Sequence, residues 1–135
     1  MLNDIQGTRM RAIAKVVGVL FIVAALYAFV DTGFGMDRTM LLGLFPVNAM
    51  LNIVHLVLGI WAYSSSRADT PAGHFCRWGG VLFIVLGLIG FAVDTPFDLI
   101  PLGGNDRFLH IGVGVVLLVT GLIDAARPRA YHRAR

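Results

Sequence analysis

Four long apolar runs, separated by short polar segments, limit what this chain can fold into. They cover residues 13–30, 41–63, 78–93 and 108–123. A membrane-spanning helix needs about 20 apolar residues, and each run reaches that length once its flanks are counted. Because no water reaches the bilayer core, the backbone there must bond to itself, which favours helices. The sequence predicts an all-α integral membrane four-helix bundle, with residues 1–135 as a single transmembrane domain.

The composition favours lipid over water around these helices. Hydrophobic residues make up 57% of the chain and charged residues 14%, against roughly a quarter charged in soluble domains. The sequence contains no glutamate and a single lysine. So few charges cannot cover four helices in water, so the lipid bilayer is the expected partner. The basic excess lies mainly at the chain ends and is attributed to membrane topology, and no nucleic acid is expected.

The second and fourth runs share a motif. Residues 44–59, LFPVNAMLNIVHLVLG, align without a gap to residues 99–114, LIPLGGNDRFLHIGVG. The alignment pairs Pro46 with Pro101, His55 with His110 and Gly59 with Gly114. The hexapeptide GVLFIV also occurs twice, at residues 18–23 and 80–85. The sequence therefore predicts two parallel two-helix repeats, residues 13–66 and 75–124, followed by a cytoplasmic basic tail at 125–135.

Charges near the predicted helix ends indicate the orientation. The N-terminal tail, the connector at 64–77 and the C-terminal tail hold nine arginine and lysine residues, and the two remaining loops hold two. Positive residues concentrate on the cytoplasmic side, so both termini are expected in the cytoplasm. Pro46 is expected in the first turn of the second helix, and Asn105 at the N-cap of the fourth.

Polar side chains inside membrane helices are costly and usually face the bundle. In the first repeat Asn48, Asn52 and His55 are spaced to share one helix face, and in the second Asp106 and His110 are four residues apart. We expect an outer polar cluster with approximate two-fold symmetry. Its candidate members are Asn48, Asn52, His55, Asp31, Asp94, Asp106, Arg107 and His110.

Three functions fit such a cluster. The leading interpretation is a hydrogen-bond network that fixes helix packing, in a non-enzymatic membrane component that binds partner membrane proteins or itself and needs no cofactor. The alternative is a redox or small-ligand-binding protein whose His55 and His110 hold a haem or a metal ion. A proton or ion path is the third. No nucleophile elbow, phosphate loop or HExxH helix is present, so no enzymatic activity is expected.

Small residues mark the expected helix contacts. These are Ala24 and Ala28, Gly80 and Gly87, and Gly112 or Gly114 with Gly121. Cys76 is the single cysteine. It can form no disulfide within the chain and is expected to pack as a small hydrophobic residue.

The segments GLFPVNAMLNIVHLVLG and GGNDRFLHIGVG resemble an uncharacterised bacterial family of small four-span membrane proteins, the domain of unknown function DUF4383. The resemblance covers about residues 15–123. It implies a four-helix protein of the bacterial cytoplasmic (inner) membrane and no particular activity. The family pattern commonly carries a histidine just before the asparagine, where this chain has Leu51. The resemblance therefore implies that a His-x-x-x-His metal pair ending at His55 is absent here. The chain is also distantly similar to four-helix membrane proteins of the DoxX type.

Overall fold

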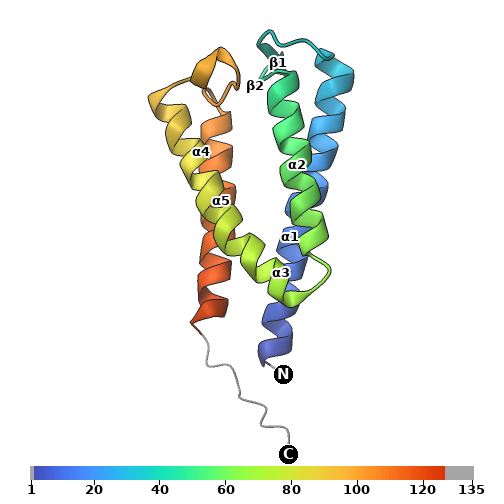
Figure 1. Cartoon of the computed structure of the whole chain (residues 1–135), viewed down its shortest axis with the longest axis vertical. Helices are drawn as coiled ribbons and strands as arrows, with labels where there is room; N and C mark the ends of the chain where they lie inside the picture. Colours follow the sequence, from blue (N-terminus) through green and yellow to red (C-terminus); the bar gives the residue numbers. More distant parts are fainter. Residues whose placement is uncertain (1, 127–135) are drawn as a thin grey trace, which may run out of the picture.

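The computed structural model describes residues 2–126, so the predicted tail at 125–135 lies outside the described residues apart from its first two. The main helices are α1 (Leu2–Thr32), α2 (Ala49–Ser65), α4 (Gly80–Ala92) and α5 (Asp106–Ala125). A short helix, α3 (Asp69–His74), and a π-helical turn, η1 (Phe75–Gly79), lead directly into α4. Four helical rods result (Figure 1). The predicted all-α bundle is confirmed.

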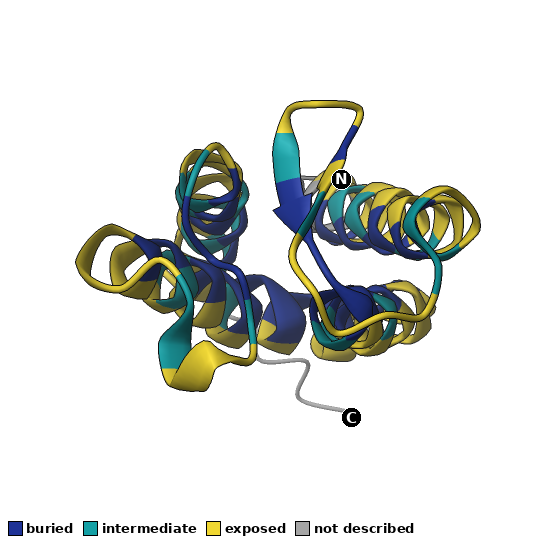
Figure 2. Cartoon of the chain, turned by 90° about the horizontal axis from the view of Figure 1, so that it is seen from above, coloured by how far each residue is buried: buried dark blue, intermediate teal, exposed yellow. Residues whose placement is uncertain are grey.

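The rods pack as two neighbouring pairs. α1 lies against α2, and α4 lies against α5. In Figure 1, α1 and the α3–α4 rod run upward, whereas α2 and α5 run downward. The two pairs therefore run in the same direction. Residues exposed on the flanks of the pairs are mostly apolar, while the buried faces turn toward the middle of the bundle (Figure 2).

A small hairpin precedes α2 and corrects one expectation. β1 (Thr39–Leu41) pairs antiparallel with β2 (Phe45–Val47), so Pro46 lies in a strand and not in the first helical turn. An outer strand tolerates proline because its missing N–H is not needed by a neighbour. The helix begins at Ala49, three residues after Pro46, and the preceding Asn48 side chain accepts a hydrogen bond from the Leu51 N–H at 2.9 Å. Asparagine is a strong N-cap, and it sets this boundary.

Two other boundaries also differ from expectation. α1 begins at Leu2, so the predicted N-terminal tail is helical. Most of the predicted connector at 64–77 is helical as well, because α3 begins at Asp69. Pro71 is compatible with that start, since the first turn of a helix has no partner for its N–H groups. Polar residues that flank a spanning run can simply continue its helix.

Three helical segments are long and apolar enough to cross a membrane: Gly7–Thr32, Asp69–Ala92 and Asp106–Ala125. α2 is apolar but has 17 residues, which span about 26 Å at 1.5 Å per residue. That length is close to the bilayer's hydrocarbon thickness of about 30 Å.

Glycines bring the helices of each pair into backbone contact. A Cβ added at Gly59 would lie 3.0 Å from the Gly18 oxygen and 2.9 Å from the Ile22 nitrogen. A Cβ added at Gly114 would lie 2.8 Å from both the Gly80 oxygen and the Ile84 nitrogen. Gly59 and Gly114 are the aligned glycines of the sequence motif, so the same crossing occurs in both pairs.

The loops at one end of the bundle contact each other through two asparagines. Asn48 Nδ2 donates to the carbonyl oxygens of Leu99, at 2.8 Å, and Met36, at 3.1 Å. Asn105 Nδ2 donates to the Leu44 oxygen at 3.0 Å. Leu44 and Leu99 are aligned residues of the motif, so each half binds the corresponding carbonyl of the other. Asn105 stands at the start of α5 but its side chain does not cap the helix.

Asn48→Ala is expected to lower the free energy of unfolding by about 2 kcal/mol, because it removes a helix cap and two partly buried hydrogen bonds to loop carbonyls. Asn105→Ala is the matched control, since its single bond is exposed. It should cost less than about 1 kcal/mol. Unfolding of the detergent-solubilised protein, followed by circular dichroism, measures both values. Equal losses would mean that the buried contacts of Asn48 do not stabilise the fold.

Candidate functional site

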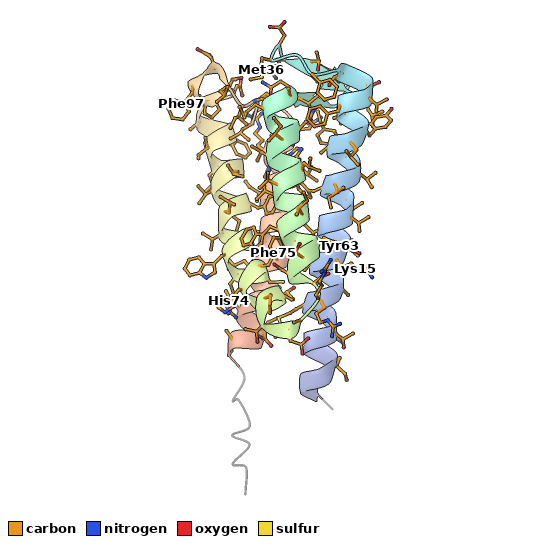
Figure 3. The ribbon with its side chains drawn as sticks, turned by 45° about the vertical axis from the view of Figure 1, so that its right-hand side comes forward. Lys15, Met36, Tyr63, His74, Phe75 and Phe97 are labelled. Carbon is orange, nitrogen blue, oxygen red and sulfur yellow. The ribbon has the colours of Figure 1, made fainter. Side chains whose placement is uncertain are left out.

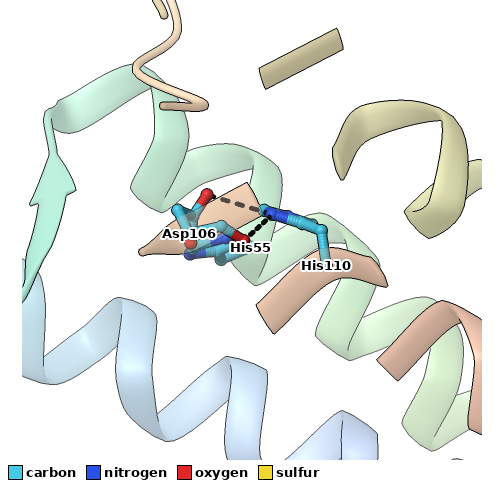
Figure 4. A group of neighbouring side chains, drawn as sticks. All are labelled: His55, Asp106 and His110. Atoms are coloured by element: carbon cyan, nitrogen blue, oxygen red, sulfur yellow. Dashed lines mark hydrogen bonds and ion pairs between the residues drawn. The ribbon is translucent and has the colours of Figure 1, made fainter. Parts of the chain in front are cut away.

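Three ionisable side chains meet inside the bundle, between the two helix pairs. His55 comes from α2, and Asp106 and His110 come from α5 (Figure 4). One ligand atom from each lies within 4.8 Å of the others. Their exposed fractions are 7%, 2% and 0%. His55 and His110 occupy the same position in the two aligned motifs, so each lies at the same place on its helix, and their rings meet.

The orientation of His110 is fixed by its own helix. Its Nδ1 lies 2.9 Å from the backbone oxygen of Asp106, one turn earlier, and 3.0 Å from the Asp106 carboxylate. The carboxylate contact has ion-pair distance but not hydrogen-bond geometry. A proton on Nδ1 is therefore best placed to bond the backbone oxygen, which leaves a lone pair on Nε2. An imidazole held in this way is ready to bind a metal ion.

Several buried polar atoms around this point have no hydrogen-bond partner among the described residues. They are Nε2 of His55, Nε2 of His110, Oδ2 of Asp106 and both amide atoms of Asn52. Asn52 is fully buried on α2 and precedes His55 by three residues, so the two share a helix face. An unpaired buried polar group costs about 1–3 kcal/mol. Their concentration at one place makes this cluster the candidate functional site.

Phenylalanine rings enclose the histidines. Phe21 meets His55 with ring centroids 5.1 Å apart, and Phe83 meets His110 at 5.6 Å. The two phenylalanines are 5.0 Å apart, and the two histidines 5.7 Å. Phe21 and Phe83 are the aligned residues of the repeated GVLFIV hexapeptide. The four rings are therefore two corresponding pairs, which lower the polarity around the polar atoms.

The site is less symmetrical in its charge than in its rings. In the aligned motifs, Leu51 stands where Asp106 stands, and Asn52 where Arg107 stands. Leu51 is fully buried, as Asp106 nearly is. The cluster therefore has two imidazoles but one carboxylate.

The other predicted members lie elsewhere. Asp94 is exposed and lies 4.0 Å from Arg107, whose guanidinium also stacks 4.6 Å from the Phe91 ring centroid. Asp31 is exposed at the end of α1. The side chain of Asn48 makes the loop and helix-cap hydrogen bonds described above.

Of the eight candidates, the structure brings together His55, Asp106 and His110, with Asn52 beside them. Sequence reasoning missed Phe21 and Phe83, although the repeated hexapeptide marked both.

The fold and the site define a helical, membrane-type protein with a buried polar cluster between two helix pairs. The chain belongs to the family DUF4383, described as a domain of unknown function, whose model matches residues 11–123. No curated protein matches the chain, and neither does any solved structure.

Proposed function

We propose that this chain is a membrane-embedded metal-binding protein that holds one divalent first-row transition-metal ion on His55, Asp106 and His110. One observation supports this most strongly. One buried ligand atom from each of the three side chains lies within 4.8 Å of the others, and each side chain also has a buried atom without a hydrogen-bond partner among the described residues. Two imidazoles and one carboxylate, with further positions open, suit ions such as Fe²⁺ or Zn²⁺. The amide oxygen of Asn52 is a fourth candidate ligand.

A packing network, the leading interpretation of the sequence, fits this geometry less well. Such a network stabilises a bundle through hydrogen bonds between helices. Here the Nε2 atoms of both histidines and the amide of Asn52 form none with the described residues. A bundle gains nothing from burying these groups unpaired, whereas an ion would satisfy several at once.

A haem fits less well than an ion. A porphyrin held by both histidines would have to lie between their rings. Those rings are 5.7 Å apart and tilted by 34°, and each already packs against a phenylalanine. The protein interior leaves few voids larger than a water molecule. Inserting a macrocycle would therefore require the two helix pairs to separate.

The proposed setting is the bacterial cytoplasmic membrane, with four spans, two parallel repeats and both termini in the cytoplasm. The distribution of arginine and lysine supports this orientation. The corresponding glycine crossings and ring pairs of the two halves support the repeats. The exposed apolar flanks would face lipid, partner membrane proteins or a second copy.

Metal analysis of the purified protein tests the proposal. After loading with Co²⁺ or Zn²⁺ and desalting, the detergent-solubilised protein is expected to keep one ion per chain and, with Co²⁺, to show visible absorption bands. His55→Gln should weaken metal binding about ten-fold or more, because changing even a residue that only supports a ligand typically lowers metal affinity by about 10–100-fold. His74→Gln, an exposed histidine on α3, is the matched control. Affinity should fall on acidification, because imidazole binds metal only in its neutral form.

A protein that retains no ion, or that loses it equally in both variants, would contradict the proposal. The packing interpretation would then stand, with His55 contributing to stability alone.

A further inference from the structure

A polar groove opens between α1 and α2, far from the buried cluster. Its volume is about 670 Å³, and it is lined by Thr8, Arg11, Ala12, Lys15, Tyr63, Ser66 and Arg67. Pockets of about 300–1,000 Å³ hold small ligands. Figure 3 labels Lys15 and Tyr63, which face the groove from α1 and α2. The lining carries three cations, three hydroxyl groups and no carboxylate.

Arg11 is held at the groove by two contacts. Its Nε donates to the Ser66 backbone oxygen at 3.2 Å, and its guanidinium lies 3.8 Å from Asp69. Asp69 is the one carboxylate paired with this guanidinium among the described residues, and its side chain is 60% exposed. The terminal nitrogens of Arg11 keep donors for a further anion, since a guanidinium has five N–H groups. Fixing the arginine in advance reduces the entropy lost on binding.

Beyond the groove, toward the bundle's centre, the helix faces that line it become apolar. On α1, the face carrying Arg11 and Lys15 continues to Val19, four residues on, which is 42% exposed. On α2, the face carrying Tyr63 continues to Ile60, which is 52% exposed. A ligand with a charged end and an apolar body matches this arrangement better than a small hydrophilic anion.

We propose that this groove binds the phosphate group of an anion, as supplied by an anionic phospholipid headgroup whose acyl chains lie along Val19 and Ile60. Arg11 and Arg67 contact the phosphate oxygens, which arginine binds in a two-pronged geometry. Lys15 adds a third positive charge, and the hydroxyl of Tyr63 is available to donate. Basic pockets between helices at the membrane surface are suited to this chemistry. The site is independent of the metal centre.

Native mass spectrometry of the full chain in detergent tests the groove with three probes: phosphatidylglycerol, phosphatidylcholine and inorganic phosphate. One phosphatidylglycerol is expected to stay bound, in preference to phosphatidylcholine. Removing each cation should weaken retention about five-fold, so Arg11→Gln with Arg67→Gln should weaken it about 25-fold. Arg9→Gln, an exposed arginine on α1 outside the groove, is the matched control and should change retention little.

Three outcomes would overturn the lipid assignment. Equal losses from Arg9→Gln would mean diffuse attraction to surface charge. Equal retention of both lipids would mean that the headgroup charge is not recognised. Displacement of the lipid by inorganic phosphate would reassign the groove to a free anion. Circular dichroism of each variant checks that the helices are retained.

Discussion

Asp106→Asn is expected to weaken metal binding at least about 100-fold while leaving the metal-free protein as stable as the parent or up to about 1 kcal/mol more stable. Asp106 supplies the one negative charge among the three ligands. A divalent ion in a low-dielectric site held by neutral ligands alone would lack compensation. Without metal, however, the buried carboxylate destabilises the fold, because its Oδ2 has no aligned hydrogen bond.

The opposite signs of these two effects separate a binding role from a structural one. Titration with Co²⁺, followed by absorption, measures affinity, and thermal unfolding of the metal-free protein measures stability. Asp31→Asn is the matched control, because it makes the same change at an exposed position. If Asp106→Asn kept its affinity and lost stability, the carboxylate would serve to orient His110 and not to bind metal.

Gly59→Ala and Gly114→Ala should each lower the free energy of unfolding by about 3 kcal/mol. An added methyl group at either position lies 3.0 Å or less from the backbone of the facing helix, so the helices must move apart. Overpacking of this kind typically costs about 1–3 kcal/mol. Because the two glycines occupy aligned positions, the two losses should be similar.

Gly112→Ala is the control for both, since nothing lies within 4 Å of a Cβ added there. Alanine favours the helix over glycine, so this variant should gain up to about 1 kcal/mol. Unfolding in the same detergent compares all three variants. A loss at Gly112 as large as that at Gly114 would show that contact with lipid, and not the crossing, explains the cost of replacing these glycines.

Periodic and repeated features were the ones that sequence reasoning predicted well. The apolar runs marked the helices, and the aligned motifs marked His55, His110 and the crossing glycine Gly114. The choice between Gly112 and Gly114 needed the structure, because Gly112 is exposed and Gly114 packs on α4. Ala24 was also expected at a contact and is exposed, whereas Ala28 is buried. In a helix that is apolar all round, composition alone does not identify the packed face.

Local boundaries and polar partners were predicted less well. Pro46 was predicted in the first turn of a helix, and its pairing with β1 places it in a strand instead. Asp31 and Asp94 were expected to join the cluster on the strength of similar positions in the chain. Both are exposed near helix ends, where solvent and headgroups can satisfy a carboxylate, and Asp94 also pairs with Arg107. Spacing along a helix indicates a shared face, but it does not fix the depth at which two helices meet.

The division of the bundle into two close-packed pairs has a mechanical consequence. Within each pair, glycine crossings bring backbone against backbone, so each pair behaves as a stiff body. Between the pairs, contact is made by side chains: a buried apolar core shared by both pairs, the loop asparagines and the polar cluster. The seam between the pairs therefore lacks the backbone crossings that hold each pair together. An ion bound to His55 of the α1–α2 pair and to Asp106 and His110 of the α4–α5 pair would crosslink the two pairs. Binding of the ion would then restrict their separation, and its release would permit it.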